Sequence, residues 1–182
     1  YLDEVKLMID EKCYPKIIIL TLPLRGTPTF FPPLGSLAII TALKKSGFKN
    51  THFYNLDLLR PSNQETIEYL KREKPDIIGI SAVVSTHYEQ TKNLSLDIKR
   101  ILPNTTIILG GNLGASAEVI LKKTGVDFIF NGESDKSIIN FTNSWLDRKS
   151  NDAFNEVDGI VFLNNQGELV ITPYAKNIEA EK

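Results

Sequence analysis

The chain has 182 residues, of which 42% are hydrophobic, enough for one globular domain with a core of its own. Its 21 basic and 22 acidic residues leave a net charge of −1, which argues against nucleic acid or an acidic membrane as a partner. The one cysteine, Cys13, excludes an internal disulfide or a cysteine-held metal cluster within this chain, and it indicates a cytoplasmic protein.

No apolar run approaches the ~20 residues of a membrane helix. The N-terminal segment is charged and lacks the apolar core of a signal peptide. Because it also lacks a starting Met, we expect the chain to be a fragment of a longer protein.

Short β-rich segments alternate with amphipathic segments of helical period. The first β-rich segment is apolar on both faces, which is typical of a central strand in a parallel sheet. Gly47 is expected to end the first helix, and the pairs Ser62/Glu65 and Thr86/Glu89 predict capping boxes. The predicted strands are residues 16–22, 51–56, 76–81, 105–109 and 127–130, and the predicted helices are residues 34–46, 62–72, 86–101, 113–123 and 134–148.

Five βα units in sequence predict an α/β fold with a five-stranded parallel sheet in the order 2-1-3-4-5 and helices on both faces. The tail differs, because residues 159–163 and 168–172 indicate a β-hairpin and residues 150–156 indicate a polar linker. We divide the chain into an N-terminal extension (1–15), a Rossmann-type domain (16–148), and a linker with hairpin (149–182).

The ends of the predicted strands suggest a ligand site. In an open parallel sheet, ligands bind beyond the carboxyl ends of the strands. A single glycine there is best explained by a tight turn, but glycines at three strand ends together favour a ligand edge, where backbone can approach a ligand closely. The candidate ligand-binding residues are Thr21, Pro23, Gly26, Pro33, Asp57, Ser81, Gly110, Gly111, Asn112, Gly132 and Glu133.

Two common nucleotide sites are excluded. No G-x-G-x-x-G follows the first strand, and no P-loop motif occurs anywhere in the sequence, so a nicotinamide or nucleoside-triphosphate site is not expected. The loop after the first strand is long and contains Pro23, Pro28, Pro32 and Pro33, which suits a broad, flat ligand.

Several segments resemble the N-terminal cobalamin (B12)-binding domain of cobalamin-dependent radical S-adenosylmethionine (SAM) enzymes. The order and spacing of these segments carry the resemblance across nearly the whole chain. The matching segments are PPLG at 32–35, PDIIGIS at 75–81, LP and IILGG between 102 and 111, VDF through GE at 126–133, and VDGIV at 157–161 with Gly167.

The resemblance implies a flavodoxin-like sandwich with the corrin ring of cobalamin over the carboxyl edge of the sheet. It implies that the nucleotide tail passes near Ser81 and the pair Gly110-Gly111. In such enzymes a following barrel holds a 4Fe-4S cluster on a C-x-x-x-C-x-x-C motif and uses SAM for methyl transfer or a related reaction. That motif is absent here, so we expect no catalysis from this chain alone, and we expect its own C-terminal radical SAM barrel as its partner.

One position departs from the other cobalamin proteins. Methionine synthases and mutases carry D-x-H-x-x-G after the first strand, and that histidine ligates cobalt. Here the same spacing runs from Thr21 to Gly26 with Pro23 in place of the histidine, so the resemblance implies binding without histidine ligation. The loss also leaves open a docking or substrate-shaping domain that has kept the fold without the cofactor.

A flavin mononucleotide protein on the same type of sheet ranks third. Such a site favours a phosphate loop rich in Ser and Thr, and Thr21, Thr27 and Thr29 make a poor one. His87 is expected on the surface of a helix's first turn rather than as a ligand. For Asp57 and Glu133 we favour polar lining or helix capping over acid–base catalysis.

Overall fold

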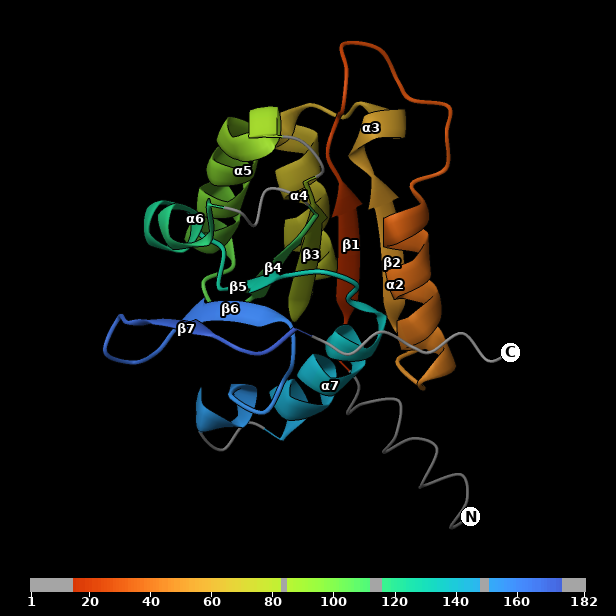
Figure 1. The fold of residues 1–182 in the computed structure, drawn as a ribbon. Coiled ribbons are helices and arrows are strands. Elements are labelled where there is room, and N and C mark those ends of the chain that lie inside the picture. Colours follow the sequence, from red (N-terminus) through yellow and green to blue (C-terminus); the bar gives the residue numbers. More distant parts are fainter. Residues whose placement is uncertain (1–14, 83–84, 112–115, 148–150, 175–182) are drawn as a thin grey trace.

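The structure is a computed structural model, and it describes residues 15–82, 85–111, 116–147 and 151–174. These residues form one seven-stranded sheet in the order β2-β1-β3-β4-β5-β6-β7, with helices on both faces (Figure 1). The strands are β1 (Ile17–Thr21), β2 (Thr51–Asn55), β3 (Ile77–Ser81), β4 (Thr106–Gly110), β5 (Phe128–Phe130), β6 (Ile160–Leu163) and β7 (Leu169–Ile171). The helices are α2 (Leu34–Lys45), α3 (Leu56–Leu59), α4 (Asn63–Glu73), α5 (Tyr88–Ile101), α6 (Ala117–Lys123) and α7 (Asp135–Leu146), with 3-10 turns η1 (Ser85–His87) and η3 (Asn151–Phe154).

The predicted parallel strands and their order are confirmed for β1 to β5. The predicted strand count is wrong, because the hairpin continues the main sheet instead of standing apart from it. Strand β6 pairs antiparallel with β5, with Phe128 opposite Phe162, and β7 pairs antiparallel with β6. The hairpin thus covers the edge of β5 that would otherwise offer unpaired backbone groups.

Two helix starts that look alike in sequence differ in the structure. Ser62 and Glu65 form the predicted capping box, with the Ser62 amide donating to the Glu65 carboxylate over 2.7 Å. The predicted box at Thr86 and Glu89 is wrong, because a 3-10 turn brings the chain into α5 and no side chain caps the described start of that helix. The predicted end of the first helix is also observed. Gly47 follows α2 and has a φ of +97°, as a C-cap glycine requires.

The end of β2 also differs from the prediction. The strand stops at Asn55, whose side-chain oxygen accepts hydrogen bonds from the amides of Asp57 (3.1 Å) and Leu58 (3.2 Å). This cap begins the short helix α3, so Asp57 lies in a helical turn and not at a strand end.

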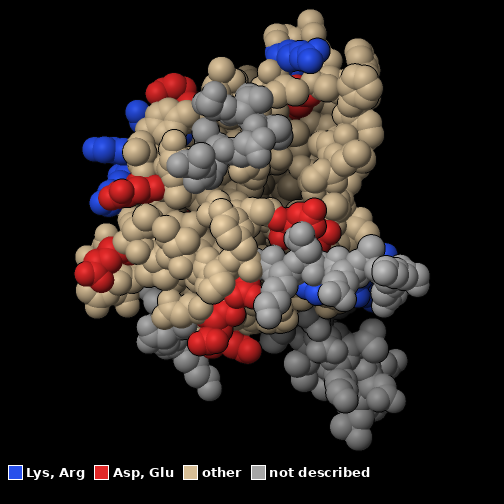
Figure 2. Space-filling model, viewed as in Figure 1, with Lys and Arg blue, Asp and Glu red and all other residues tan. Residues whose placement is uncertain are grey.

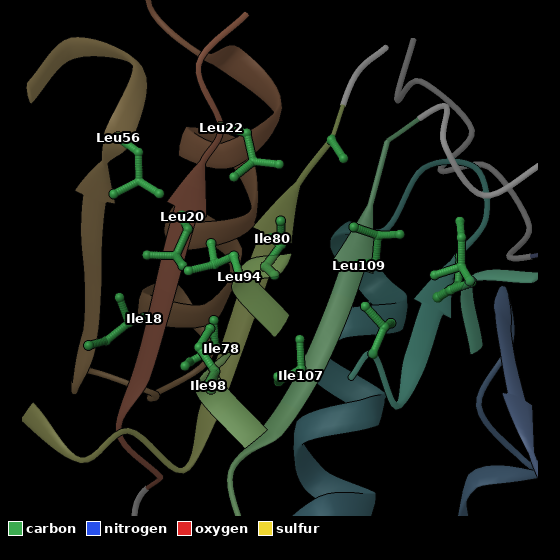
Figure 3. Close-up of a cluster of buried hydrophobic side chains, with 14 of the residues drawn as sticks. Ile18, Leu20, Leu22, Leu56, Ile78, Ile80, Leu94, Ile98, Ile107 and Leu109 are labelled. Carbon is green, nitrogen blue, oxygen red and sulfur yellow. The ribbon is translucent and has the colours of Figure 1, made fainter. Parts of the chain in front are cut away.

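The sheet separates two hydrophobic cores. On one face, Ile18 and Leu20 of β1 pack with residues of α4, α5 and α6 (Figure 3). On the other face, Ile17 and Ile19 pack with residues of α2 and α7. This division follows from the alternation of side chains along a strand that is buried on both sides.

The polar segment after α7 is not the linker that its sequence predicts. Its described part includes η3, whose Phe154 is only 5% exposed. The Phe154 ring lies 4.6 Å from that of Phe128 and 5.2 Å from that of Phe141, centroid to centroid. Phe154 therefore belongs to the core on the α2/α7 face. No helix in the described residues is long and apolar enough to cross a membrane.

Candidate functional site

A cleft of about 540 Å³ opens at the carboxyl edge of the sheet, between α2 and α7. Strands β1, β3, β4 and β5 contribute its floor, and the first turns of the two helices contribute its walls. The residues that line the cleft include Ile19, Ile39, Gly79, Ser81, Ile108, Gly110, Gly111, Phe130, Gly132, Glu133, Ser134 and Ile138.

The strand register gives the floor two levels. At the outer level, Ser81 and Gly110 stand side by side on β3 and β4, and Thr21 of β1 lies next to Ser81 outside the cleft lining. Two residues deeper, Ile19, Gly79 and Ile108 stand in the same way and face the same side. The outer level is small and polar, and the inner level is apolar.

Gly79 lets the Ile19 side chain pass close over the backbone at the inner level. A Cβ at this position would lie 2.6 Å from Ile19 Cδ1 and 3.6 Å from Ile108 Cγ1. Glycine inside a buried strand commonly marks a place where another group approaches the backbone. A Cβ on Gly110, by contrast, would meet nothing within 4 Å, so a side chain there would project into open space at the cleft.

The hydroxyl groups near the outer level differ in their availability. Thr21 Oγ1 and Ser36 Oγ are 2.9 Å apart and hydrogen-bond each other, which joins β1 to α2. The Ser81 hydroxyl makes no hydrogen bond to any described residue and lines the cleft. Ser81 is therefore the outer-level side chain that is free to bind a ligand.

The amino-terminal ends of α2 and α7 both lie at the cleft. Within the described residues no side chain caps either helix, and α2 also has no acidic residue in its first turn. Uncapped amide groups and the helix dipole favour an anion at such a place. At α7, Asp135 in the first turn already supplies negative charge, so α2 is the more favourable end.

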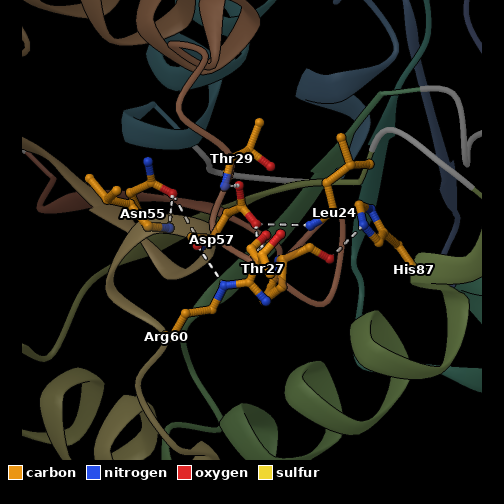
Figure 4. Close-up of polar contacts among 9 residues, drawn as sticks. Leu24, Thr27, Thr29, Asn55, Asp57, Arg60 and His87 are labelled. Carbon is orange, nitrogen blue, oxygen red and sulfur yellow. Dashed lines mark hydrogen bonds and ion pairs between the residues drawn. The ribbon is translucent and has the colours of Figure 1, made fainter.

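Asp57 is engaged in holding the loop between β1 and α2 (Figure 4). Its carboxylate accepts hydrogen bonds from the amides of Leu24 and Thr29, each over 3.0 Å, and from the Arg60 guanidinium over 2.7 Å. Arg60 also donates to the Thr27 carbonyl over 2.6 Å. Burial raises the pKa of the Asp57 carboxyl, but the hydrogen bonds from Thr29 and Leu24 and the charge of Arg60 outweigh it and hold that pKa below its usual value.

His87 contacts the same loop through the carbonyl group of Pro23. It is only 2% exposed, so the predicted surface position is wrong. Its Nε2 lies 3.1 Å from the carbonyl oxygen of Pro23, and since a carbonyl only accepts, Nε2 carries the donated proton. Nδ1 is buried and has no hydrogen-bond partner in the described structure. Burial lowers the pKa of His87, although the Pro23 contact and the charge of Asp57 partly oppose this.

The loop itself presents apolar side chains to solvent. Phe30 and Phe31 are 91% and 83% exposed, and Leu34 at the start of α2 is also exposed. Uncharged residues cover most of this end of the molecule, at the upper right of Figure 2. Contiguous exposed apolar patches commonly occur at sites of interaction.

A model of the B12 binding domain family matches residues 24–140. The chain belongs to this family. The resemblance found in the sequence motifs is thereby confirmed, and the cleft lies at the carboxyl edge of a B12-binding domain.

Curated relatives include the anaerobic magnesium-protoporphyrin IX monomethyl ester cyclases of Cereibacter sphaeroides and Rubrivivax gelatinosus. The chain is 25% identical to the first over 150 residues, covering 81% of the chain and 24% of the cyclase. It is 25% identical to the second over 151 residues, covering 82% of the chain and 27% of that cyclase. The chain thus spans about a quarter of the length of these relatives.

Solved structures with the same fold include two radical SAM enzymes. The cobalamin-dependent enzyme OxsB with aqua-cobalamin bound superposes with a TM-score of 0.77 at 16% identity, covering 94% of this chain and 24% of OxsB. The methyltransferase TsrM from Kitasatospora setae superposes with a TM-score of 0.72 at 14% identity, covering 88% of this chain and 30% of TsrM. At these identities the likeness establishes the fold of this B12-binding domain.

The candidate residues separate into two groups in the B12-binding domain. The cleft brings together Ser81, Gly110, Gly111, Gly132 and Glu133. Gly111 and Gly132 also have φ values of +102° and +81°, which explains the need for glycine there. The candidates that do not line the cleft are Thr21, Pro23, Gly26, Pro33 and Asp57, while Asn112 lies outside the described residues.

The deeper lining of the cleft is not evident from the sequence. Ile39, Phe130 and Ile138 look like ordinary core residues in sequence, because their spacing is that of any buried helix face or strand. Gly79 gave a usable signal, since a glycine within an apolar strand is uncommon. Among the described residues, no group of three or more His, Cys, Asp or Glu is placed to hold a metal ion.

Proposed function

We propose that this B12-binding domain binds cobalamin with the nucleotide tail in the cleft between α2 and α7 and the corrin ring over the carboxyl edge of the sheet. The observation that carries the proposal is the cleft itself, which opens at the carboxyl edge of the sheet, where open parallel sheets bind their ligands.

The residues present fit the cofactor. The cleft of about 540 Å³ is of the size that small-molecule sites have. The flat base of the tail would lie against Ile19, Ile108 and the apolar residues beside them, and the Ser81 hydroxyl would hydrogen-bond the base from the outer level. The uncapped start of α2 would face the phosphate of the tail.

We propose that no histidine of this domain ligates cobalt. Pro23 stands where other cobalamin proteins carry the ligand and has no side-chain donor. The nearby His87 is buried and already donates its Nε2 proton to the Pro23 carbonyl. The loop between β1 and α2 would then support the lower face of the corrin by contact alone.

Bound cobalamin supplies a cobalt centre for methyl transfer or radical chemistry, and this domain would hold and orient it. We propose that the complete protein carries a radical SAM barrel with a 4Fe-4S cluster that performs a methyl transfer or related reaction. Two radical SAM enzymes of the same fold, the cobalamin-dependent OxsB and the methyltransferase TsrM, support this proposal, as does the coverage of only about a quarter of the curated relatives.

The exposed Phe30 and Phe31 favour a second candidate function, docking onto a partner without the cofactor. The two functions differ in a simple test. Titration of the protein with hydroxocobalamin, followed by visible absorption, measures binding directly. Absence of binding at high micromolar cobalamin would eliminate the first function and leave the second.

A pair of valine variants tests the place of binding. In Gly110→Val the new side chain enters the cleft, and we expect the affinity for cobalamin to fall about tenfold or more. Lys71→Val is the control, because Lys71 is exposed on α4, which packs against the opposite face of the sheet. Equal binding by the Gly110 variant and the parent would show that the tail lies elsewhere.

A further inference from the structure

The deep part of the cleft is formed by apolar side chains. Ile19, Ile108, Phe130 and Ile138 are all buried and belong to the core on the α2/α7 face. Ile39 of α2 lines the cleft beside them and is half-buried. None of these side chains offers a hydrogen-bond donor or acceptor.

The backbone of the floor is also saturated. Strand β3 pairs with β1 on one side and β4 on the other, and β1 and β4 each have a second partner strand. The amide and carbonyl groups beneath the ligand are therefore committed to the sheet. A polar group inserted to this depth would find no partner from the floor.

Polar groups gather instead at the outer rim. The rim holds Ser81, Glu133 and Ser134, and Ser134 Oγ donates to the Gly132 carbonyl over 3.1 Å. The cleft thus changes from polar at its mouth to apolar at its base. A ligand that matches it needs the same gradient.

We propose that this cleft selects corrinoids by their lower base, and that it prefers a benzimidazole with an apolar outer edge over a purine. The inference rests on the proposed function, because it concerns which tail enters the same cleft. The tail is tethered to the corrin ring through its ribose phosphate, so the glycosylated five-membered ring of the base stays near the rim. The six-membered ring then enters the apolar part.

The two classes of base differ in that ring. Dimethylbenzimidazole carries two methyl groups there, which gain from burial against isoleucine and phenylalanine. Adenine carries ring nitrogens and an amino group, and these would lose their water without gaining a partner. The cleft therefore discriminates through unpaired polar groups, which discriminate more strongly than small differences in apolar size.

Three corrinoids test the proposal with the intact chain: cobalamin, the adenine-containing analogue pseudocobalamin, and cobinamide, which has no nucleotide tail. We expect pseudocobalamin to bind about tenfold or more weakly than cobalamin, with cobinamide also weaker than cobalamin. If none of the three binds, the proposed function fails. If cobalamin and pseudocobalamin bind equally and both exceed cobinamide, the proposed function stands and the base preference is overturned.

Two matched variants connect the preference to the cleft. Ile39→Gln places an amide beside the deep part, and we expect it to reduce the ratio of the two affinities severalfold. Ile67→Gln is the control, because Ile67 is half-buried on α4, against the opposite face of the sheet. If Ile39→Gln keeps the parent's ratio of cobalamin affinity to pseudocobalamin affinity, the proposal is overturned. It is also overturned if this ratio falls equally in both variants. Far-ultraviolet circular dichroism and cobinamide binding verify that each variant is folded.

Discussion

Asp57 holds the loop after β1 with both of its carboxylate oxygens. The sequence places an acidic residue correctly near the carboxyl edge, but it does not reveal that two loop amides and Arg60 occupy it. Thr29 lies 28 residues and Leu24 lies 33 residues from Asp57 in the sequence, so no local sequence pattern predicts these hydrogen bonds.

Replacing this carboxylate measures what the loop contributes. Asp57→Asn loses the charge and one acceptor, and we expect the free energy of unfolding to fall by about 1–3 kcal/mol. Urea unfolding at neutral pH is the measurement. Asp97→Asn serves as control, since its pair with the exposed Arg100 should contribute no more than about 0.5 kcal/mol. Equal losses in the two variants would contradict the anchoring role.

The pH dependence follows from the lowered pKa of Asp57. The unfolded chain takes up a proton at the usual carboxyl pKa of about 4, before the folded chain does. The stabilisation is therefore present above that pH and is lost as the pH falls through the folded value. Asp57→Asn should flatten the acid limb of the stability curve.

His87 gives a second pH dependence in a different window. Its pKa is lowered in the folded state, chiefly by burial. Below the ordinary histidine pKa of about 6.5 the unfolded chain is protonated first, so stability should fall as the pH decreases from there. His87→Gln should remove this slope between about pH 7 and pH 5, whereas His52→Gln, at an exposed site, should keep it. An unchanged slope in the His87 variant would refute the assignment.

At the scale of elements, periodicity predicts what lies within a strand or helix but not what docks between elements. Both capping-box pairs have the same spacing, yet only Ser62 and Glu65 form a box, because the chain reaches α5 through the turn η1. The segment around Phe154 is polar on average, but the burial of the Phe154 ring fixes this segment against the core on the α2/α7 face.

A substitution of Phe154 therefore tests whether the segment after α7 is packed into the core or is a linker. Phe154→Ala empties a site among three other aromatic rings, and we expect a loss of about 3 kcal/mol or more in the free energy of unfolding. Leu146→Ala, at an exposed position on α7, should cost less than about 1 kcal/mol. A small effect at Phe154 in chemical denaturation would restore the linker interpretation.

At the scale of the whole molecule, the sequence predicts the order of the five parallel strands, because short right-handed crossovers leave few alternatives. It does not predict that the hairpin joins the same sheet. A hairpin signal records the pairing of two strands with each other, and the partner of its outer edge depends on packing such as that of Phe162 on Phe128.

The joined sheet predicts the result of shortening the chain. A protein ending at Asp147 would expose the edge of β5 and the aromatic rings beside it, so we expect it to aggregate or to lose fixed side-chain packing. Size-exclusion chromatography and near-ultraviolet circular dichroism report these two outcomes. A monomeric shortened chain with an unchanged spectrum would show that the domain does end before the hairpin.

The division of the core by the sheet has a consequence for motion. The face covered by α4, α5 and α6 is packed against Ile18 and Leu20, whereas the face covered by α2 and α7 contains the cleft. Local opening requires less energy where fewer apolar contacts are lost. Amide hydrogens of α2 and α7 should therefore exchange with solvent deuterium faster than those of α4 and α5, and a ligand seated between them should slow that exchange on one face alone.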